Sequence, residues 1–268
     1  MSYKGILGAT IGDIIGSRFE WNNYKAKDFE LFTDQCSFTD DTVMTLAISK
    51  ALLECDGDYT NLSHKTIANM QKFGQIYPNA GYGGSFSSWL LDENPKPYNS
   101  WGNGSAMRVS ACAYFARSLD EAMELSHKVT AVTHNHPEGL KGAEATTVAT
   151  YMALHGFSKE EIRQYILKNY YNIDFTLDDI RDSYHFDVSC QGSVPEALQA
   201  FFESEDYEDA IRNAISIGGD SDTIAAITGA VAGAYYGIPN SIKETALTYL
   251  TLDLKEIVDN FDNQIKVA

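Results

Sequence analysis

The sequence of 268 residues predicts an all-α fold, and three observations support this prediction. Only six prolines occur, so long windows are free of helix breakers. Alanine occurs 27 times and valine 10 times, which favours helix over strand. The alternation of apolar and polar residues that is typical of strands is scarce. No low-complexity linker or composition shift marks a boundary, so we expect one globular domain over residues 1–268.

Two predicted helices, from opposite ends of the chain, carry glycine at every fourth position. These glycines are Gly8, Gly12 and Gly16 in the first helix, and Gly229, Gly233 and Gly237 in the second. Residues four apart lie along one ridge of a helix, so each stripe exposes bare backbone. Because a glycine costs a helix about 1 kcal/mol relative to alanine, the stripes indicate close packing of two backbones. We expect both helices at the centre of the domain, with their adjacent loops brought together.

The other elements follow from apolar spacing and from helix start signals. A helix is predicted over 42–54, where apolar residues recur at helical spacing, and another over 224–238. The segment 74–104 is rich in Gly, Asn, Pro, Ser and Tyr, which predicts a long folded loop. Capping-box patterns at 158–161, 176–179 and 193–196 predict three helix starts. The last pattern has Pro195 near its first turn and predicts a helix through Phe202.

The charge and the cysteines limit the class of protein. The chain has 37 acidic and 20 basic residues and a formal net charge of −17, which argues against bulk nucleic-acid binding and against adhesion to anionic membranes. The longest apolar stretch, 224–238, is shorter than the roughly 20 residues of a membrane helix. The four cysteines form no C-x-x-C pair, and the start of the chain lacks signal-peptide features. We expect a cytoplasmic protein, with a monomer as the default.

Two short acidic motifs precede predicted helices. They are Ser-Phe-Thr-Asp-Asp-Thr at 37–42 and Gly-Gly-Asp-Ser-Asp-Thr at 218–223. Helix capping alone is one interpretation, but a single Asp suffices for capping. Four convergent carboxylates would repel one another unless a cation lay between them. Carboxylate and hydroxyl oxygens suit Mg²⁺ or Mn²⁺ better than zinc, so the pair of motifs favours a site for such a cation.

Three further signals are weaker when each is taken alone. Glu20 stands where the first glycine-striped helix is expected to end, a position at which a lone glutamate is usually solvated. The Gly-rich loops 81–85 and 102–105 can present backbone N–H groups to phosphate, although turn formation would explain either loop. His134 and His136 lie two residues apart without a third ligand, which is poor evidence for zinc and is commonly found in a polar loop.

Taken together, these segments resemble the ADP-ribosylglycohydrolase family. The matching pieces, in family order, are GATIGDIIG at 8–16 with Phe19 and Glu20, FTDDT at 38–42, GYGGS at 81–85, GNGSAMR at 102–108, THNHP at 133–137 and GGDSDTIAA at 218–226. Six pieces in order, from residue 8 to about 239, make a specific signal. The resemblance implies a single orthogonal helical domain with a cleft that holds two Mg²⁺ or Mn²⁺ ions.

The resemblance also implies roles for individual residues. The implied metal ligands are Thr39, Asp40, Asp41, Asp220, Asp222 and Thr223. The implied catalytic residues are Glu20, in an acidic catalytic or gating position, and Asp40 and Asp41, which would orient metal and ribose. The implied substrate contacts are Gly83, Gly84 and Ser85 along the diphosphate, Asn103, Gly104, Ser105 and Met107 beside the ribose, and His134. His136 is expected to be structural, and no motif in 170–190 assigns the adenine contacts.

The implied activity is hydrolysis of the bond between C1″ of ADP-ribose and an acceptor side chain of an ADP-ribosylated protein, which releases ADP-ribose. An arginine acceptor is favoured, and serine-linked ADP-ribose and O-acetyl-ADP-ribose stay open. Two other interpretations remain. One is a binuclear phosphohydrolase that cleaves a nucleotide diphosphate. The other is a catalytically silent module that binds ADP-ribose.

Overall fold

The computed structural model describes residues 3–265, and in that range the secondary structure is helical. It comprises fourteen α-helices, four short 3₁₀ helices and two isolated β-bridges, without a sheet among the described residues. The α-helices are α1 (Leu7–Gly16), α2 (Asp40–Cys55), α3 (Leu62–Ile76), α4 (Gly84–Leu90), α5 (Ala111–Phe115), α6 (Leu119–Thr130), α7 (Pro137–Leu154), α8 (Lys159–Asn169), α9 (Leu177–Ile180), α10 (Val194–Glu203), α11 (Tyr207–Ile215), α12 (Ser221–Tyr236), α13 (Asn240–Tyr249) and α14 (Leu252–Ile265). The predicted all-α fold is confirmed.

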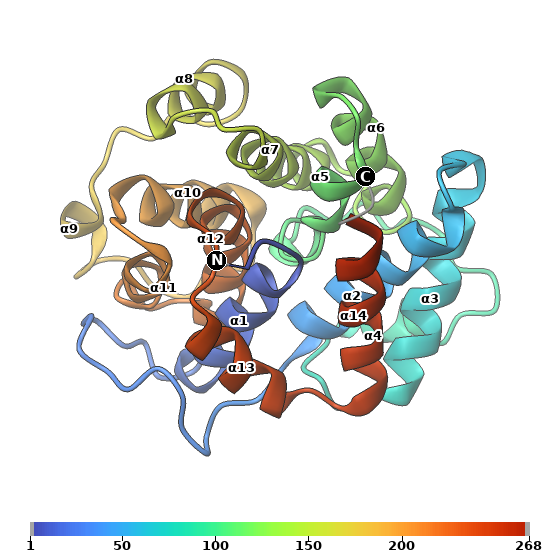
Figure 1. Ribbon diagram of the computed structural model, residues 1–268, viewed down its shortest axis with the longest axis horizontal. Coiled ribbons are helices and arrows are strands. Elements are labelled where there is room, and N and C mark those ends of the chain that lie inside the picture. The colour runs from blue at the N-terminus through green and yellow to red at the C-terminus, as the bar shows by residue number, and fades with distance from the viewer. Residues whose placement is uncertain (1–2, 266–268) are drawn as a thin grey trace.

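Helices α1 and α12 pack against each other at the centre of the molecule, as the glycine stripes predict (Figure 1). Every residue of α1 is buried. A Cβ atom added to Gly8 would lie 2.4 Å from the backbone oxygen of Gly229, and one added to Gly12 would lie 2.0 Å from that of Ala225. Neither distance leaves room for a methyl group. The two backbones are therefore in direct contact, and only glycine fits at these positions.

One member of the second stripe has a different role. The helix ends at Tyr236, so Gly237 lies beyond it, with φ of 74° and its N–H bonded to the oxygen of Gly233. With ψ of 162°, Gly237 adopts a backbone conformation that is essentially restricted to glycine, and the chain leaves the helix there. At the other end of α12, Asp222 and not a glycine faces α1, because a Cβ on Gly16 would lie 2.6 Å from the Asp222 Cα. The predicted helix over 224–238 thus begins three residues earlier and ends two residues earlier.

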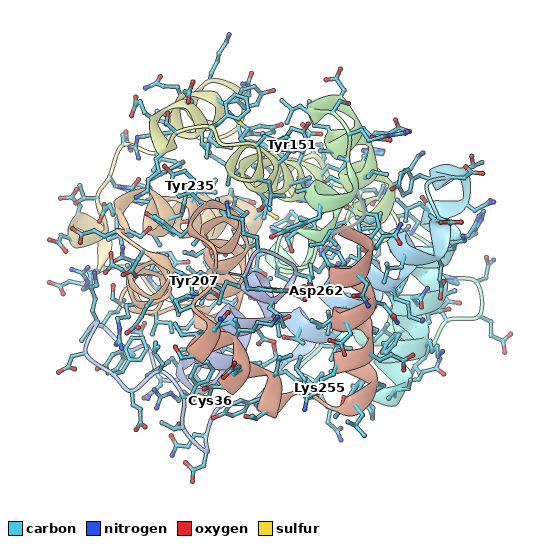
Figure 2. All side chains as sticks on the ribbon, viewed as in Figure 1. Cys36, Tyr151, Tyr207, Tyr235, Lys255 and Asp262 are labelled. Carbon is cyan, nitrogen blue, oxygen red and sulfur yellow. The ribbon has the colours of Figure 1, made fainter. Side chains whose placement is uncertain are left out.

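The remaining helices surround this central pair. Helices α2, α3 and α4 lie on one side and α9, α10 and α11 on the other, with α6, α7 and α8 along one edge (Figure 1). Side chains fill the spaces between these ribbons (Figure 2). The buried Tyr207 of α11, for example, donates a hydrogen bond of 2.9 Å to the backbone oxygen of Gly8 in α1. Because the helices on both sides pack against α1 and α12, this central pair determines where the ends of the surrounding helices meet.

Two local predictions need correction. The segment 74–104 is not all loop, because α3 continues to Ile76 and α4 forms within it. Helix α4 buries Phe86, Trp89 and Leu90, so tertiary contacts override its Gly- and Ser-rich start. The capping boxes at 158–161 and 176–179 are present, but Ser193 does not cap α10. Its hydroxyl instead donates to the backbone oxygens of residues 187 and 189, and α10 still begins with proline in its first turn.

No helix within 3–265 is long and apolar enough to cross a membrane. The four cysteines are all buried and unpaired. The chain therefore depends on packing, and not on disulfides, for its stability.

Candidate metal centre and ligand cleft

Three parts of the chain bring six carboxylates to one place. The carboxylates are those of Asp13 in α1 and Glu20 in the turn after it, of Asp40 and Asp41 in the first turn of α2, and of Asp220 and Asp222 at the start of α12. The close contact of α1 with α12 sets the first and third parts side by side. The sequence predicted five of the six.

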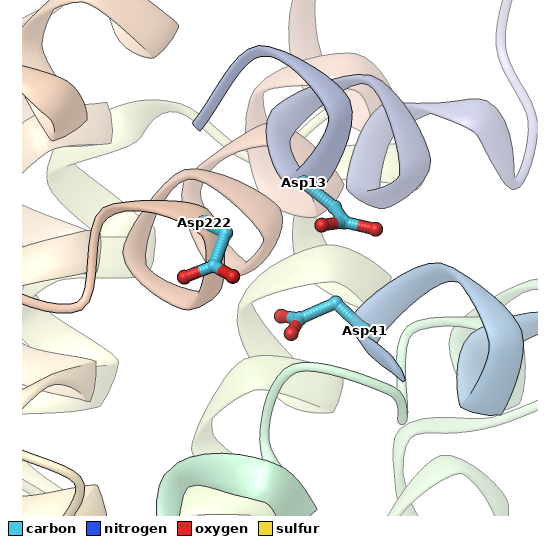
Figure 3. Close-up of side chains that lie close together, drawn as sticks. All are labelled: Asp13, Asp41 and Asp222. Atoms are coloured by element: carbon cyan, nitrogen blue, oxygen red, sulfur yellow. The ribbon is translucent and has the colours of Figure 1, made fainter. Parts of the chain in front are cut away.

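The side chains form two groups, each of three carboxylates. Oxygens of Asp13, Asp41 and Asp222 lie within 4.8 Å of one another, and these three side chains point into a common space (Figure 3). Oxygens of Glu20, Asp220 and Asp222 meet the same limit. Asp222 belongs to both groups, so the two groups adjoin. Asp40 lies outside both.

Asp13 is the residue that sequence reasoning missed. It is fully buried and accepts hydrogen bonds from the backbone N–H groups of Thr39 and Thr42, at 2.9 and 3.0 Å, and from the Thr39 hydroxyl at 2.7 Å. These bonds tie the start of α2 to the middle of α1. A signal was present in the sequence, because Asp13 is the only charged residue in an otherwise uncharged helix. A buried charge in such a helix needs a partner.

Asp41 has an oxygen whose hydrogen-bonding capacity is unused. Its Oδ2 lies 3.4 Å from the hydroxyl oxygens of Thr39 and Thr223, whereas its buried Oδ1 has no hydrogen-bond partner among the described residues. An orphaned buried carboxylate oxygen is costly. A cation held between Asp13, Asp41 and Asp222 would satisfy it. Thr39 and Thr223 thus adjoin the first group.

Burial and neighbouring carboxylates raise the pKa values of acidic residues in the site. Burial raises the pKa of Asp222 well above its usual range, and the charges of Asp41, Asp220 and Glu20 raise it further. Burial, together with neighbouring carboxylates, raises the pKa of Glu20 and that of Asp40 to about 7. Such a cluster of oxygen ligands fits hard divalent cations, which would compensate the repulsion. The residues present therefore fit two Mg²⁺ or Mn²⁺ ions.

A cleft of about 570 Å³ opens beside the carboxylates. This volume is typical of small-molecule sites. Its walls include most of the residues predicted to meet substrate or metal: Glu20, Asp40, Asp41, Gly83, Gly84, Ser85, Asn103, Gly104, Met107, His134, Asp220, Asp222 and Thr223. The structure thus brings the motifs into one cavity, although the most distant of them are about 200 residues apart in sequence.

Two predicted residues lie behind the cleft wall. The hydroxyl of Thr39 is directed to Asp13, as described above. Ser105 is fully buried and its hydroxyl donates to the backbone oxygen of Gly139 at 2.9 Å. Ser105 belongs to the same turn as Asn103. The Nδ2 group of Asn103 donates a hydrogen bond of 2.7 Å to Asp220 Oδ2. The 102–105 loop is therefore bonded directly to the acidic cluster.

The cleft also has residues that the sequence motifs did not single out. Trp21, Trp101, Phe186 and Val188 line it and are exposed large apolar side chains. The rings of Trp21 and Phe186 stack, with centroids 5.0 Å apart. Phe186 comes from the 170–190 segment to which no motif could be assigned. These side chains give the mouth of the cleft flat apolar surfaces.

The two histidines of the 133–139 segment differ in position. His134 is 4% exposed and lines the cleft. His136 caps α7 by accepting a hydrogen bond of 3.1 Å from the Glu138 N–H, in agreement with a structural role. Arg108 also lines the cleft and is the only arginine or lysine among the lining residues that the structure describes.

Comparison with known proteins agrees with this architecture. The family model described as ADP-ribosylglycohydrolase matches residues 3–267. The human ADP-ribosylhydrolase ARH3 is 24% identical, with 94% of this chain and 91% of that protein covered. The ADP-ribosylarginine hydrolase Tri1 of Pseudomonas putida (strain GB-1) is 27% identical, with coverage of 87% and 70%.

A solved structure described as an ADP-ribosylglycohydrolase-related protein complex has the same fold. It superimposes with a TM-score of 0.74 at 22% identity and covers 97% of this chain and 95% of its own. The match of a family model over nearly the whole chain shows the family directly. The chain therefore belongs to the ADP-ribosylglycohydrolase family and is a hydrolase.

Proposed function

We propose that the protein is a divalent-cation-dependent ADP-ribosyl hydrolase. It would cleave the bond between C1″ of ADP-ribose and an acceptor side chain and release ADP-ribose. The observation that carries the proposal is the pair of three-carboxylate groups that share Asp222 beside the cleft. The names of the relatives, which describe ADP-ribosylhydrolases, support the substrate class.

The proposal assigns the cation ligands as follows. Asp13, Asp41 and Asp222 would hold one Mg²⁺ or Mn²⁺ ion, and Glu20, Asp220 and Asp222 would hold the second. Thr39, Asp40 and Thr223 are the further ligands that the family motifs imply. The cations would supply Lewis-acid polarisation of ribose oxygens and of the attacking water. Asp13 extends the ligand set that the sequence predicted.

Glu20 and Asp40 are the two acids positioned to act on the ligand. Both are half-buried and line the cleft, whereas the other four carboxylates are buried. Glycosidic cleavage develops oxocarbenium character and needs a proton for the leaving group. The Glu20 carboxylate oxygen that is not bound to a cation would take a proton from the attacking water and release it to the departing side chain. Asp40, with Asp41, would orient the ribose.

The Gly-rich loops would fix the rest of ADP-ribose. No atom lies within 4 Å of a Cβ added at Gly83 or at Gly84, so the backbone there is open to the cleft. This opening, with Ser85, would receive the diphosphate through backbone N–H groups. Asn103, Gly104 and Met107 would border the ribose. Holding remote parts of the ligand in this way orients the reacting carbon.

We favour arginine as the acceptor. One relative is named as an ADP-ribosylarginine hydrolase, and the acidic end of the cleft suits a cationic guanidinium leaving group. Serine-linked ADP-ribose and O-acetyl-ADP-ribose are the competing acceptor chemistries. We also keep a cytoplasmic monomer as the working description, since buried free thiols suit a reducing compartment.

A panel of defined substrates tests the proposal. Arginine-linked, serine-linked and O-acetyl ADP-ribose are each incubated with Mg²⁺, with Mn²⁺ and with chelator, and products are separated by chromatography. Metal-dependent release of ADP-ribose is expected, fastest from the arginine-linked substrate. Release of AMP would instead indicate diphosphate cleavage. Binding of ADP-ribose in calorimetry without release from any substrate would indicate a silent binding module.

A further inference from the structure

Arg108 is a buried cation without an ion pair. It is 1% exposed and the ion pairs of the described residues do not include it. Its guanidinium lies 4.9 Å from the centroid of the Phe86 ring, and its Nε has no hydrogen-bond partner among the described residues. Burial of an arginine without a carboxylate is costly. The contacts that it does make therefore need an explanation.

Those contacts are to a threonine and a histidine of the cleft wall. An NH2 group of Arg108 donates to the Thr133 hydroxyl oxygen at 2.7 Å and lies 3.3 Å from His134 Nδ1. The same Thr133 oxygen is 2.7 Å from His134 Nδ1. A guanidinium has donors only, so it cannot accept a proton from Nδ1. The Thr133 hydroxyl hydrogen has two acceptors within reach, His134 Nδ1 at 2.7 Å and the Thr130 backbone oxygen at 3.4 Å, and the contact to Nδ1 is the shorter.

The other nitrogen of the ring faces the cleft wall. A Cβ atom added to Gly102 would lie 3.5 Å from His134 Nε2, and one added to Gly104 would lie 3.6 Å from it. Both glycines line the cleft. With Nδ1 acting as acceptor toward Thr133 and Arg108, a neutral ring must carry its hydrogen on Nε2.

We propose that Arg108 and Thr133 are positioning residues that hold His134 as its neutral Nε2–H tautomer, so that Nε2 donates a hydrogen bond to an oxygen of the bound ligand. The tautomer follows from the contacts described above, whereas the hydrogen bond from Nε2 to the ligand rests on the proposed function. A second proton on the ring would lie on Nδ1, and it would point a charged N–H group at the positively charged guanidinium of Arg108. Burial and the charge of Arg108 accordingly hold the pKa of His134 well below its usual range. His134 is thus a fixed donor and not a general acid or base.

Nitrogen-15 NMR of the full-length protein, labelled in histidine, tests the tautomer at pH 7. The His134 signals are assigned by their absence from His134→Gln. We expect a protonated Nε2 and an unprotonated Nδ1 in the wild type. A ring protonated on Nδ1, or on both nitrogens, overturns the proposal. Because this readout uses the unaltered protein, it does not depend on a variant that folds.

A matched pair of variants tests the positioning role. Thr133→Val removes the hydroxyl that faces Nδ1, and Thr130→Val makes the same change one turn earlier, where the buried hydroxyl has no partner among the described residues. We expect mixed His134 tautomers and about threefold to tenfold weaker ADP-ribose binding with Mg²⁺ for Thr133→Val, the size of one neutral hydrogen bond. Thr130→Val should match the wild type in its His134 tautomer and in its affinity for ADP-ribose.

The outcomes separate this inference from the proposed function. Unchanged tautomer and unchanged ADP-ribose affinity in Thr133→Val overturn the positioning role. Loss of affinity in His134→Leu but not in His134→Gln, which keeps a distal N–H donor, supports the donor role, and equal losses contradict it. If the wild type shows the Nε2–H tautomer but binds no ADP-ribose, the proposed function fails while the tautomer assignment stands.

Discussion

Asp222 is the residue on which both carboxylate groups depend. It lies in the first turn of α12, is buried, and adjoins Asp13 and Asp41 in one group and Glu20 and Asp220 in the other. A carboxylate in that position has two oxygens and can bridge two cations. At the scale of single residues, the site is therefore a set of carboxylates around one shared side chain.

Glu20→Gln tests the proton role at the residue scale. At saturating Mg²⁺, we expect kcat to fall by about 10²–10⁴, the range for loss of a general acid–base group, while the Kd of ADP-ribose changes little. Steady-state kinetics measures kcat, and calorimetry measures the Kd of ADP-ribose. Glu93→Gln, at an exposed position that does not line the cleft, is the control. Kinetics equal to the wild type would remove Glu20 from the mechanism.

The raised acid pKa values predict how stability depends on pH when metal is removed. Glu20 and Asp40 have pKa values of about 7 in the folded protein, against about 4 in an unfolded chain. The folded state binds protons more tightly, so their stabilising contribution is fully present below about pH 4 and is lost as the pH rises through 7. The Tm in chelator should therefore fall between pH 5.5 and 8.

Saturating Mg²⁺ supplies the control for this pH series. Cations bind the deprotonated carboxylates, so added Mg²⁺ should raise the Tm more at pH 8 than at pH 5.5. Thermal melts with and without metal measure both slopes. A metal-free Tm that rises with pH over this range would contradict the assigned cluster.

The sequence identified most of these residues but not how they are arranged. Asp40, Asp41, Asp220 and Asp222 were predictable because each motif holds more carboxylates than helix capping needs. Asp13 was not, because a single acid within a helix has no partner until the fold places α2 against it. The exclusion of Asp40 from both groups of three is likewise a matter of side-chain direction, which spacing does not encode.

At the scale of elements, the contact of α1 with α12 positions the site. Bare backbone along Gly8, Gly12 and Gly229 lets the helices approach closely, and Gly16 reaches the backbone of Asp222 itself. The stripe was legible in the sequence because its period matches the helix. Helix α4 was not, because Gly and Ser at its start signal a turn while its stability comes from burial of aromatic side chains.

Gly12→Ala tests this helix contact. The new Cβ would lie 2.0 Å from the Ala225 backbone oxygen, which cannot move without its helix. We expect a loss of about 1–3 kcal/mol or more in the free energy of unfolding, measured by urea denaturation, with weaker metal binding. Gly233→Ala is the milder comparison, since its Cβ would lie 3.2 Å from the Gly8 Cα and alanine favours the helix. Equal effects of the two variants would contradict the close-contact account.

At the scale of the whole molecule, the strong negative charge and an anionic ligand have to be reconciled. Two bound divalent cations would neutralise only four of the 17 excess negative charges, so the surface would stay acidic. ADP-ribose must then be attracted locally, by cations, by Arg108 and by backbone N–H groups within the cleft. Composition argues against polyanion binding, because it reports on the surface as a whole. It could not reveal a small positive region inside a cleft.

The central claim is that one shared carboxylate holds two cations for hydrolysis. Its most direct test is the metal stoichiometry of Asp222→Asn beside the wild type, from Mn²⁺ calorimetry and from release of ADP-ribose. We predict two ions per wild-type chain, with both sites and turnover lost in the variant. Asp259→Asn, at an exposed position of α14, should leave both unchanged. Full metal-dependent turnover with two bound ions in Asp222→Asn would contradict the account.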